Sequence, residues 1–329
     1  MLTSRENLMR TLSGNGADRL VNQYDPFIPI MNDPIMCYVR GNRKKGCTTK
    51  DEWGTTFIWP EGQYAAMPHV SVNDKVLPDI CKWRNYVNVP DIAANCTEWT
   101  DSIKSAAAID REERMVMSFM GTGIFEQSHF LMGFEDTLIN FLAYPESMQE
   151  LLERISKYRM TYARLLVENL HPDAILSHDD WGSKMAMFMS PTIWRKFIKP
   201  LYAKLYGYMK SQGVLVIHHA DSYLADIVED MAEIGIDIWQ GVLPQNDIPV
   251  IQKQLKGRMT LMGGIDSAIV DKAGSTEEVI RKEVRRACEA YAPNGYFIPC
   301  LTYGLKGSIF SHVDPIISDE IDKCSGMFF

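Results

Sequence analysis

A chain of 329 residues is long enough to form either two ordinary domains or one α/β barrel. Its hydrophobic fraction of 46% and charged fraction of 23% are typical of a soluble globular protein. The net charge of −8 argues against nucleic acids and anionic membrane surfaces as the main partners, because both are themselves negatively charged.

The composition also indicates a cytoplasmic protein. The seven cysteines are an odd number, widely scattered and without a CxxC pair, which is typical of reduced thiols and not of a disulfide framework. The first residues carry charge where a signal peptide would need an apolar stretch. No apolar run approaches the length of about 18 residues that a membrane-spanning helix needs.

The first third of the chain predicts one helix followed by irregular structure. The helix starts at Thr3 or Ser4 and is stopped by a Gly-Asn-Gly sequence. Residues 21–30 are apolar but interrupted by two prolines, so we expect a short strand or an extended segment. Residues 31–110 look like an irregular elaboration on a core, with an exposed basic loop at Arg40–Gly46.

From about residue 115, short apolar strands alternate with longer helical segments. The strands are expected at 116–120, 174–177, 214–217, 236–239, 259–262 and 296–299, and the helices at 135–143, 147–169, 190–212, 223–234, 248–255 and 276–291. Strands that are apolar on both faces predict a parallel sheet buried under helices. Six such units favour a single closed (β/α)8 TIM barrel over an open doubly wound sheet. No GxGxxG motif supports dinucleotide binding.

Polar and metal-binding side chains follow these strands. In a barrel the carboxyl ends of all strands form one rim, and active sites lie there. The segments that follow the strands are Gly121–Glu126, His178–Gly182, His218–Asp221, Gln240–Gly241, Gly263–Asp266 and Cys300–Gly304. The sequence therefore predicts an active site assembled from these loops.

A metal site is the strongest candidate at this rim. Side chains alternate along a strand, so His219 and Asp221 point to one side and His218 to the other. Together with Cys300 they would give zinc an imidazole, a carboxylate and a thiolate, and leave a fourth position open. The alternative is a buried hydrogen-bonded pair of His219 and Asp221 with an unrelated buried thiol.

A series of short motifs runs along nearly the whole chain in one order. They are Arg5–Gly14 with Asp18–Arg19, Asp51–Gly54, Phe125–Glu126 with Gly133, Pro145–Glu146, Asp179–Gly182, Ser190–Pro191 with Lys199–Pro200, Gly235–Gln240 and Met262–Asp266. In this order they resemble the uroporphyrinogen decarboxylase superfamily, whose fold is a (β/α)8 barrel. The resemblance implies one barrel domain over residues 1–329.

Two departures separate the chain from the true decarboxylases. Those enzymes carry an arginine-rich segment after the first strand, where this chain has Pro29–Pro34, and an Asn-x-Gly-His-Gly-like turn after the last strand, where it has Pro299–Gly304. The chain is more similar to the cobamide-dependent methyltransferases of the superfamily, which move a methyl group between a corrinoid protein and a thiol, an ether or a folate. Thiol-active members resemble it at His219 and Cys300 but have a cysteine in place of Asp221.

Asp221 changes the chemistry that the resemblance implies. Two thiolates keep a zinc-bound thiol nucleophilic, whereas a His/Asp/Cys set leaves more positive charge on the metal and makes a stronger Lewis acid. We therefore expect a methyltransferase that uses zinc to cleave a methyl ether, with an aromatic ether favoured. The methyl group would pass to the Co(I) corrinoid of a partner protein. A homodimer is compatible with this fold.

The same hypothesis predicts catalytic or substrate-binding roles for other residues at this rim. Asp180 and Glu126 are the catalytic candidates, and the substrate-binding candidates are Phe125, Asp179, Trp181, Trp239, Gln240 and Tyr303. The two aspartates could instead cap the next helix, and Trp239 could simply pack in the core. His178 and His218 are expected to be structural or to support the metal ligands.

Two other functions stay open. One is the decarboxylation of a smaller carboxylated substrate without a cofactor, which the apparent lack of positive charge on the rim disfavours. The other is a non-catalytic protein that binds a corrinoid or another ligand and has lost its metal. The absence of a cysteine at position 221 keeps that third function open.

Overall fold

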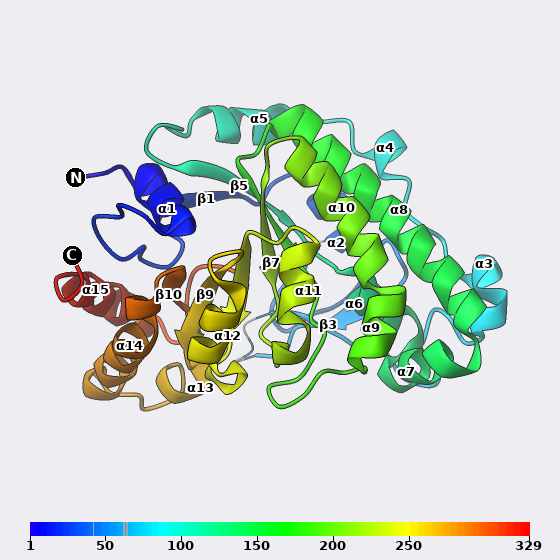
Figure 1. Ribbon diagram of the computed structural model, residues 1–329. Coiled ribbons are helices and arrows are strands. Elements are labelled where there is room, and N and C mark those ends of the chain that lie inside the picture. Colours follow the sequence, from blue (N-terminus) through cyan, green and yellow to red (C-terminus); the bar gives the residue numbers. More distant parts are fainter. Residues whose placement is uncertain (42, 62, 64) are drawn as a thin grey trace.

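Seven parallel strands form one curled sheet in the computed structural model, which describes residues 1–41, 43–61, 63 and 65–329 (Figure 1). Their order in the sheet is their order in the chain: β1 (Phe27–Ile30), β5 (Met115–Met120), β6 (Ala174–His178), β7 (Leu215–His219), β8 (Ile238–Val242), β9 (Thr260–Ile265) and β10 (Phe297–Leu301). Because every pair of neighbours is parallel, all seven carboxyl ends lie at the same edge of the sheet.

The strands are buried on both faces, as their apolar sequences predict. In β5 the side chains of Met115 and Met117 belong to an inner cluster, whereas those of Val116 and Met120 belong to an outer cluster beneath the helices. The inner cluster continues across the sheet with Leu176, Ile217, Ile238, Met262 and Ile298. Burial on both sides is what makes near-continuous apolar runs favourable in a parallel sheet.

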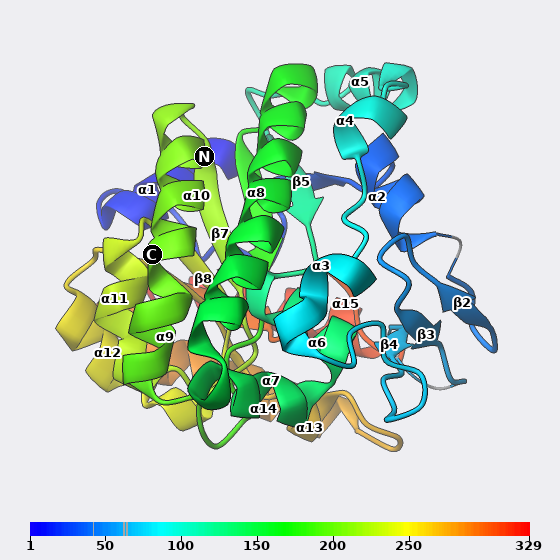
Figure 2. The ribbon, with the colours of Figure 1, turned by 90° about the vertical axis from the view of Figure 1, so that its right-hand side faces the viewer.

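Helices cover the outer face of the sheet (Figures 1 and 2). The longest is α8 (Pro145–Leu170), which packs against α6 (Ile124–Met132) and α10 (Lys199–Ser211). The other helices of this part are α7 (Phe134–Ala143), α9 (Pro191–Phe197), α11 (Val228–Glu233), α12 (Ile248–Leu255), α13 (Ser267–Val270), α14 (Glu277–Tyr291) and α15 (Val313–Ser325), with 3-10 turns η2 (Ala225–Ile227), η3 (Pro244–Asn246) and η4 (Ala292–Asn294).

The N-terminal third is an elaboration on this core. Helix α1 (Ser4–Ser13) starts where the sequence predicts, with Thr3 as the N-cap in a capping box with Glu6. A small antiparallel sheet stands to one side in Figure 2 and consists of β2 (Thr48–Lys50), β3 (Thr56–Ile58) and β4 (Met67–Pro68). The remaining elements are α2 (Pro34–Arg40), η1 (Ile80–Lys82), α3 (Trp83–Tyr86), α4 (Ile92–Asn95) and α5 (Thr100–Ala107).

The expected eight-stranded barrel is confirmed only as a parallel α/β sheet of seven strands. Within the described residues no backbone ladder joins the edge strands β1 and β10. Side chains bridge this seam instead: the amide of Leu301 donates to Gln23 Oε1 over 3.2 Å, and the Tyr24 hydroxyl donates to the Tyr303 carbonyl over 3.0 Å. The segment from 31 to 110 forms short helices and the separate small sheet, so it supplies no further strand to the main sheet.

Two element boundaries differ from expectation for simple reasons. The helix predicted over 190–212 is divided between α9 and α10 at Ile198, where Lys199 is followed by Pro200. Helix α6 is absent from the sequence prediction because it has only nine residues and is buried nearly all round, polar positions included, so it shows no clear helical period. Across the described ranges, no helix is long and apolar enough to cross a membrane.

Candidate active site

A cavity of about 560 Å³ lies beyond the carboxyl ends of β5, β6 and β7. The loops after these three strands form one wall, and residues from α2, β3 and β4 of the N-terminal elaboration form another. Aromatic side chains make much of its surface: Phe57, Phe119, Phe130, Phe134 and Phe188. The cavity is therefore a largely apolar pocket at the edge where a parallel α/β sheet places its active site.

Three side chains that could bind a metal meet at the edge of this cavity, which is lined by His178 and Asp180, with His219 buried beside them. His178, Asp180 and His219 each offer one ligand atom, and these atoms lie within 4.8 Å of one another. The rings of His178 and His219 are 4.5 Å apart, because the two residues are paired in register across β6 and β7. Among the residues that the structure describes, this is the one group of three such side chains that meets this distance limit.

Both histidines are held by their Nδ1 atoms. His178 Nδ1 donates to Glu126 Oε2 over 2.9 Å, and His219 Nδ1 donates to Gln240 Oε1. The Gln240 amide is fixed in turn, since its Nε2 donates to the carbonyls of Leu301 and Tyr303. This leaves Nε2 of each ring as the nitrogen available to a metal, which is how protein metal sites orient their histidines.

The electrostatics of the group fit a cation. Burial lowers the pKa of His219 to about 3, so this ring is neutral and ready to bind a metal. Burial also raises the pKa of Asp180 well above its usual value, and it raises the pKa of Asp221 to about 6. A divalent cation would stabilise the ionised form of these crowded carboxyls. Two imidazoles and a carboxylate are also a normal ligand set for catalytic zinc.

The pair of His178 and Glu126 is an ion pair when no metal is bound. Burial lowers the pKa of His178, but the Glu126 carboxylate opposes this and raises it to about 9. The pKa of Glu126 falls below its usual value although burial works in the other direction, because His178 and the Gly123 amide stabilise its charge. A metal at His178 would have to displace one proton.

Gly304, on the loop after β10, is packed against both rings. A methyl group at this position would lie 3.3 Å from the His219 ring and 3.4 Å from the His178 ring. A larger side chain would push the rings out of place. The glycine is therefore part of how the loop after the last strand supports the two histidines.

Asp179 caps helix α6, which is one of the two roles that the sequence leaves open. Its carboxylate accepts the backbone amides of Phe125 and Glu126, and also the Trp181 indole and the Tyr202 hydroxyl. It is fully buried and does not line the cavity. Its contribution is to place α6, and with it Glu126, against the cavity.

The predicted ligands Asp221 and Cys300 have different surroundings. Asp221 lines the cavity, and its amide donates to Asp180 Oδ1 over 3.1 Å. Cys300 is fully buried in the inner apolar cluster, with its Sγ 3.8 Å from Gln23 Oε1. Gln240 occupies the place between His219 and β10, so Cys300 does not join the histidine group. The set His219, Asp221 and Cys300 stays a prediction, and the structure groups His219 with His178 and Asp180 instead.

Most of the aromatic candidates are core residues. Trp181 and Trp239 are fully buried, and their indoles donate to Asp179 and to the Ala220 carbonyl. Trp239 therefore has the core-packing role that the sequence leaves open. Phe125 is buried behind Phe134 and Phe188, which do line the cavity. Tyr303 is half-buried, and its carbonyl accepts from Gln240 and Tyr24.

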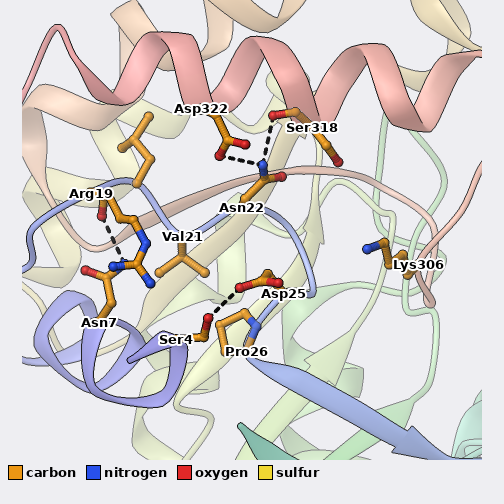
Figure 3. A pocket seen from close by; sticks show the side chains of 11 residues that line it. Ser4, Asn7, Arg19, Val21, Asn22, Asp25, Pro26, Lys306, Ser318 and Asp322 are labelled. Atoms are coloured by element: carbon orange, nitrogen blue, oxygen red, sulfur yellow. Dashed lines mark hydrogen bonds between the residues drawn. The ribbon is translucent and has the colours of Figure 1, made fainter. Parts of the chain in front are cut away.

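A second cavity lies at the start of β1 and shares no residue with the first (Figure 3). It measures about 250 Å³, and its polar groups already bond to one another. Ser4 donates to Asp25 over 2.6 Å, and Asn22 donates to the Ser318 carbonyl and to Asp322, as Figure 3 shows. Its groups hold α1 and α15 against the seam and do not resemble a reactive centre.

The family model for uroporphyrinogen decarboxylase (URO-D) matches residues 51–306, which is more than three quarters of the chain. The chain belongs to this family. The uroporphyrinogen decarboxylase of Thermus thermophilus is 28% identical over 136 residues, which cover 41% of this chain and 37% of the relative. That of Geotalea daltonii is 25% identical over 151 residues, or 45% and 40% of the two chains. The chain thus spans well under half the length of the curated relatives it matches.

The solved structure of a methyltransferase from Methanosarcina mazei has the same fold. It aligns over 98% of this chain and 99% of its own, with a TM-score of 0.69 and 16% sequence identity. At this identity the similarity shows the fold alone. The resemblance to the URO-D superfamily that the sequence motifs predict is therefore confirmed at the level of family and fold.

The basic segment Arg40–Gly46 is not simply an exposed loop. Arg40 and Arg43 line the cavity, and Lys184 from the loop after β6 joins them. Lys44 and Lys45 are exposed, and Asn42 lies outside the described residues. The sequence misses this placement because residues 34–46 carry no motif and are brought to the cavity only by the packing of the N-terminal elaboration.

Proposed function

We propose that this URO-D family protein is an enzyme that moves a methyl group from a methyl ether to the Co(I) corrinoid of a partner protein. The observation that carries the proposal is the group of His178, Asp180 and His219 at an aromatic cavity, with both histidines held by their Nδ1 atoms. The fold shared with a methyltransferase supports it. We assign zinc to these three residues, with Asp221 beside them.

The bound zinc would supply a Lewis acid for the ether oxygen. The chain's own residues prepare the site for it. Glu126 holds a proton of His178 on Nδ1, and Gln240 does the same for His219, so Nε2 would be the ligand atom of each ring. Gly304 lets the two rings lie side by side.

The aromatic wall would bind the donor and exclude water. Phe119 lies beside His178, with ring centroids 6.3 Å apart, so a substrate ring at the metal position would contact it. The Co(I) corrinoid of the partner would supply the electron pair for the new bond to the methyl group. The ether oxygen would keep the electron pair of the broken carbon–oxygen bond and take a proton from water, which would release a phenol or an alcohol.

Decarboxylation of a carboxylated substrate is the second candidate, because one objection to it is removed. The sequence suggests a rim without positive charge, but Arg40, Arg43 and Lys184 line the cavity. Such a reaction would need no metal and no partner. It would release carbon dioxide and leave the ether untouched.

One experiment separates the candidates, including a non-catalytic binding protein. The zinc-loaded protein is mixed with a methoxybenzene derivative, with and without a reduced corrinoid protein, and free phenol and methylated corrinoid are measured. We expect both products only when the corrinoid protein is present, and neither from the His219→Ala variant. Carbon dioxide released from uroporphyrinogen without a partner would show that the methyltransferase proposal is wrong, and bound zinc without turnover would favour a binding role.

A further inference from the structure

Two arginines of the N-terminal elaboration line the same cavity as His178 and Asp180. Arg40 is the last residue of α2, and Arg43 follows after the chain turns at Gly41, whose φ of 63° suits glycine. Both line the cavity together with Phe57 and Phe119. They precede residue 51, where the match to the family model begins, so they belong to the part of the chain that the family model does not cover.

Arg40 is half-buried and forms no ion pair with a carboxylate of the described residues. Its guanidinium donates to Met36 Sδ over 3.8 Å, and no carboxylate of the described residues lies within 4.0 Å of it. Asp33 and Glu126 act on it only from further away. A half-buried guanidinium that lines a cavity without a carboxylate partner has donors free to bind an anion from outside the chain.

Arg43 is positioned more rigidly. Its guanidinium lies over the Phe57 ring, 3.5 Å from the centroid, and its Nε donates to the Arg40 carbonyl over 3.2 Å. Asp51 is 3.9 Å away, at the limit of an ion pair. A guanidinium that is stacked on a ring and weakly paired keeps its donors available for a planar anion such as a carboxylate.

The distance from the arginines to the histidines suits one aromatic ring. The Arg40 guanidinium is 5.9 Å from the Phe119 ring, and the Phe119 ring is 6.3 Å from the His178 ring. Phe119 is thus near both the Arg40 guanidinium and the His178 ring. A substituted benzene lying along Phe119 would reach both groups.

We propose that the methyl donor is an aromatic methyl ether that also carries a carboxylate, with the carboxylate bound by Arg40 and Arg43 and the methoxy group facing His178, Asp180 and His219. This inference rests on the proposed function for the methoxy end. The anion site itself rests only on the two arginines and the aromatic wall. It therefore has a test that needs no cobalt and no turnover.

The test is calorimetric binding of 4-methoxybenzoate and of the neutral 4-methoxybenzyl alcohol to the zinc-loaded protein. The wild type should prefer the carboxylate. Arg40→Gln and Arg43→Gln should each lower the affinity for 4-methoxybenzoate by about 10- to 100-fold, which is the usual effect of losing a hydrogen bond to a charged group. Binding of the alcohol should change less than about 3-fold.

Two control variants keep the test decisive. Lys44→Gln removes the same charge one residue from Arg43 at an exposed position and should change neither affinity. Arg40→Lys keeps the charge and should bind 4-methoxybenzoate better than Arg40→Gln. An equal loss for both ligands, or a wild type that does not prefer the carboxylate, would overturn the anion site. Tight carboxylate binding without any methyl transfer would instead leave the anion site standing and count against the proposed function.

Discussion

The ends of β7 and β10 carry similar sequences but have different surroundings. Each is an apolar strand with a residue able to bind a metal near its carboxyl end: His219 is the last residue of β7, and Cys300 is the last but one of β10. His219 is paired with His178 in register, and its neighbours His178 and Asp180 line the cavity. Cys300 is enclosed in the inner apolar cluster beside Gln23. A metal-binding residue at a strand end becomes a ligand only where neighbouring strands bring partners to it.

The largest effect should come from removing a ligand at the β6 and β7 ends. His178→Ala, Asp180→Ala and His219→Ala should each lower zinc affinity by more than about 100-fold, because a site with three protein ligands binds poorly with two. Metal content after dialysis against a weak chelator measures this. A Cys300→Ser protein that loses zinc while His178→Ala retains it would reverse the comparison and favour the ligand set His219, Asp221 and Cys300.

A smaller effect should come from the residue that separates the two strand ends. Gln240→Leu removes the acceptor for His219 Nδ1 and should lower zinc affinity by about 10- to 100-fold, as the loss of such supporting hydrogen bonds commonly does. Competition with a fluorescent zinc chelator gives the affinity. Gln240→Glu keeps an acceptor for Nδ1 and is the matched control, expected to bind zinc more tightly than Gln240→Leu.

The pH dependence of zinc binding should reveal the pair of His178 and Glu126. The pKa of His178 is raised to about 9, so zinc must displace its proton at neutral pH, and the apparent affinity should rise about tenfold per pH unit up to about pH 9. Glu126→Gln removes the charge that raises this pKa. The zinc affinity of this variant should therefore reach its plateau at a lower pH than the zinc affinity of the wild type. Identical pH profiles for the two proteins would argue against His178 as a ligand.

The smallest effect is expected at Cys300. Burial raises the pKa of its thiol well above the usual value, and the side chain is fully enclosed. Alkylation of the native protein at pH 8 should label the exposed Cys37, Cys47 and Cys81 and leave Cys300 unmodified with or without zinc. Mass spectrometry locates the label. Labelling of Cys300 only in the zinc-free protein would show that zinc protects it, as a ligand would be protected.

The periodic part of the fold is predictable from the sequence. From residue 115 onward, the apolar strands and the helices between them are local patterns, and burial on both faces explains why they form a parallel sheet. The count of strands is less predictable. Residues 21–30 and 31–110 could supply one strand or two to the main sheet. The outcome depends on prolines and on contacts between distant residues, such as Gln23 and Leu301, and such contacts produce no periodic pattern in the sequence.

The sequence by itself determined the family, the parallel α/β fold and the rim where chemistry-bearing residues gather. Only the tertiary structure decided which of them meet. His178 joins His219 because strand register makes them neighbours, while Gln240 comes between His219 and Cys300. Arg40 reaches the cavity because an irregular segment folds over the sheet. Local sequence patterns indicate which residues are buried and to which side of a strand they point. Which side chains come within bonding distance depends instead on strand register and on packing between segments far apart in the chain.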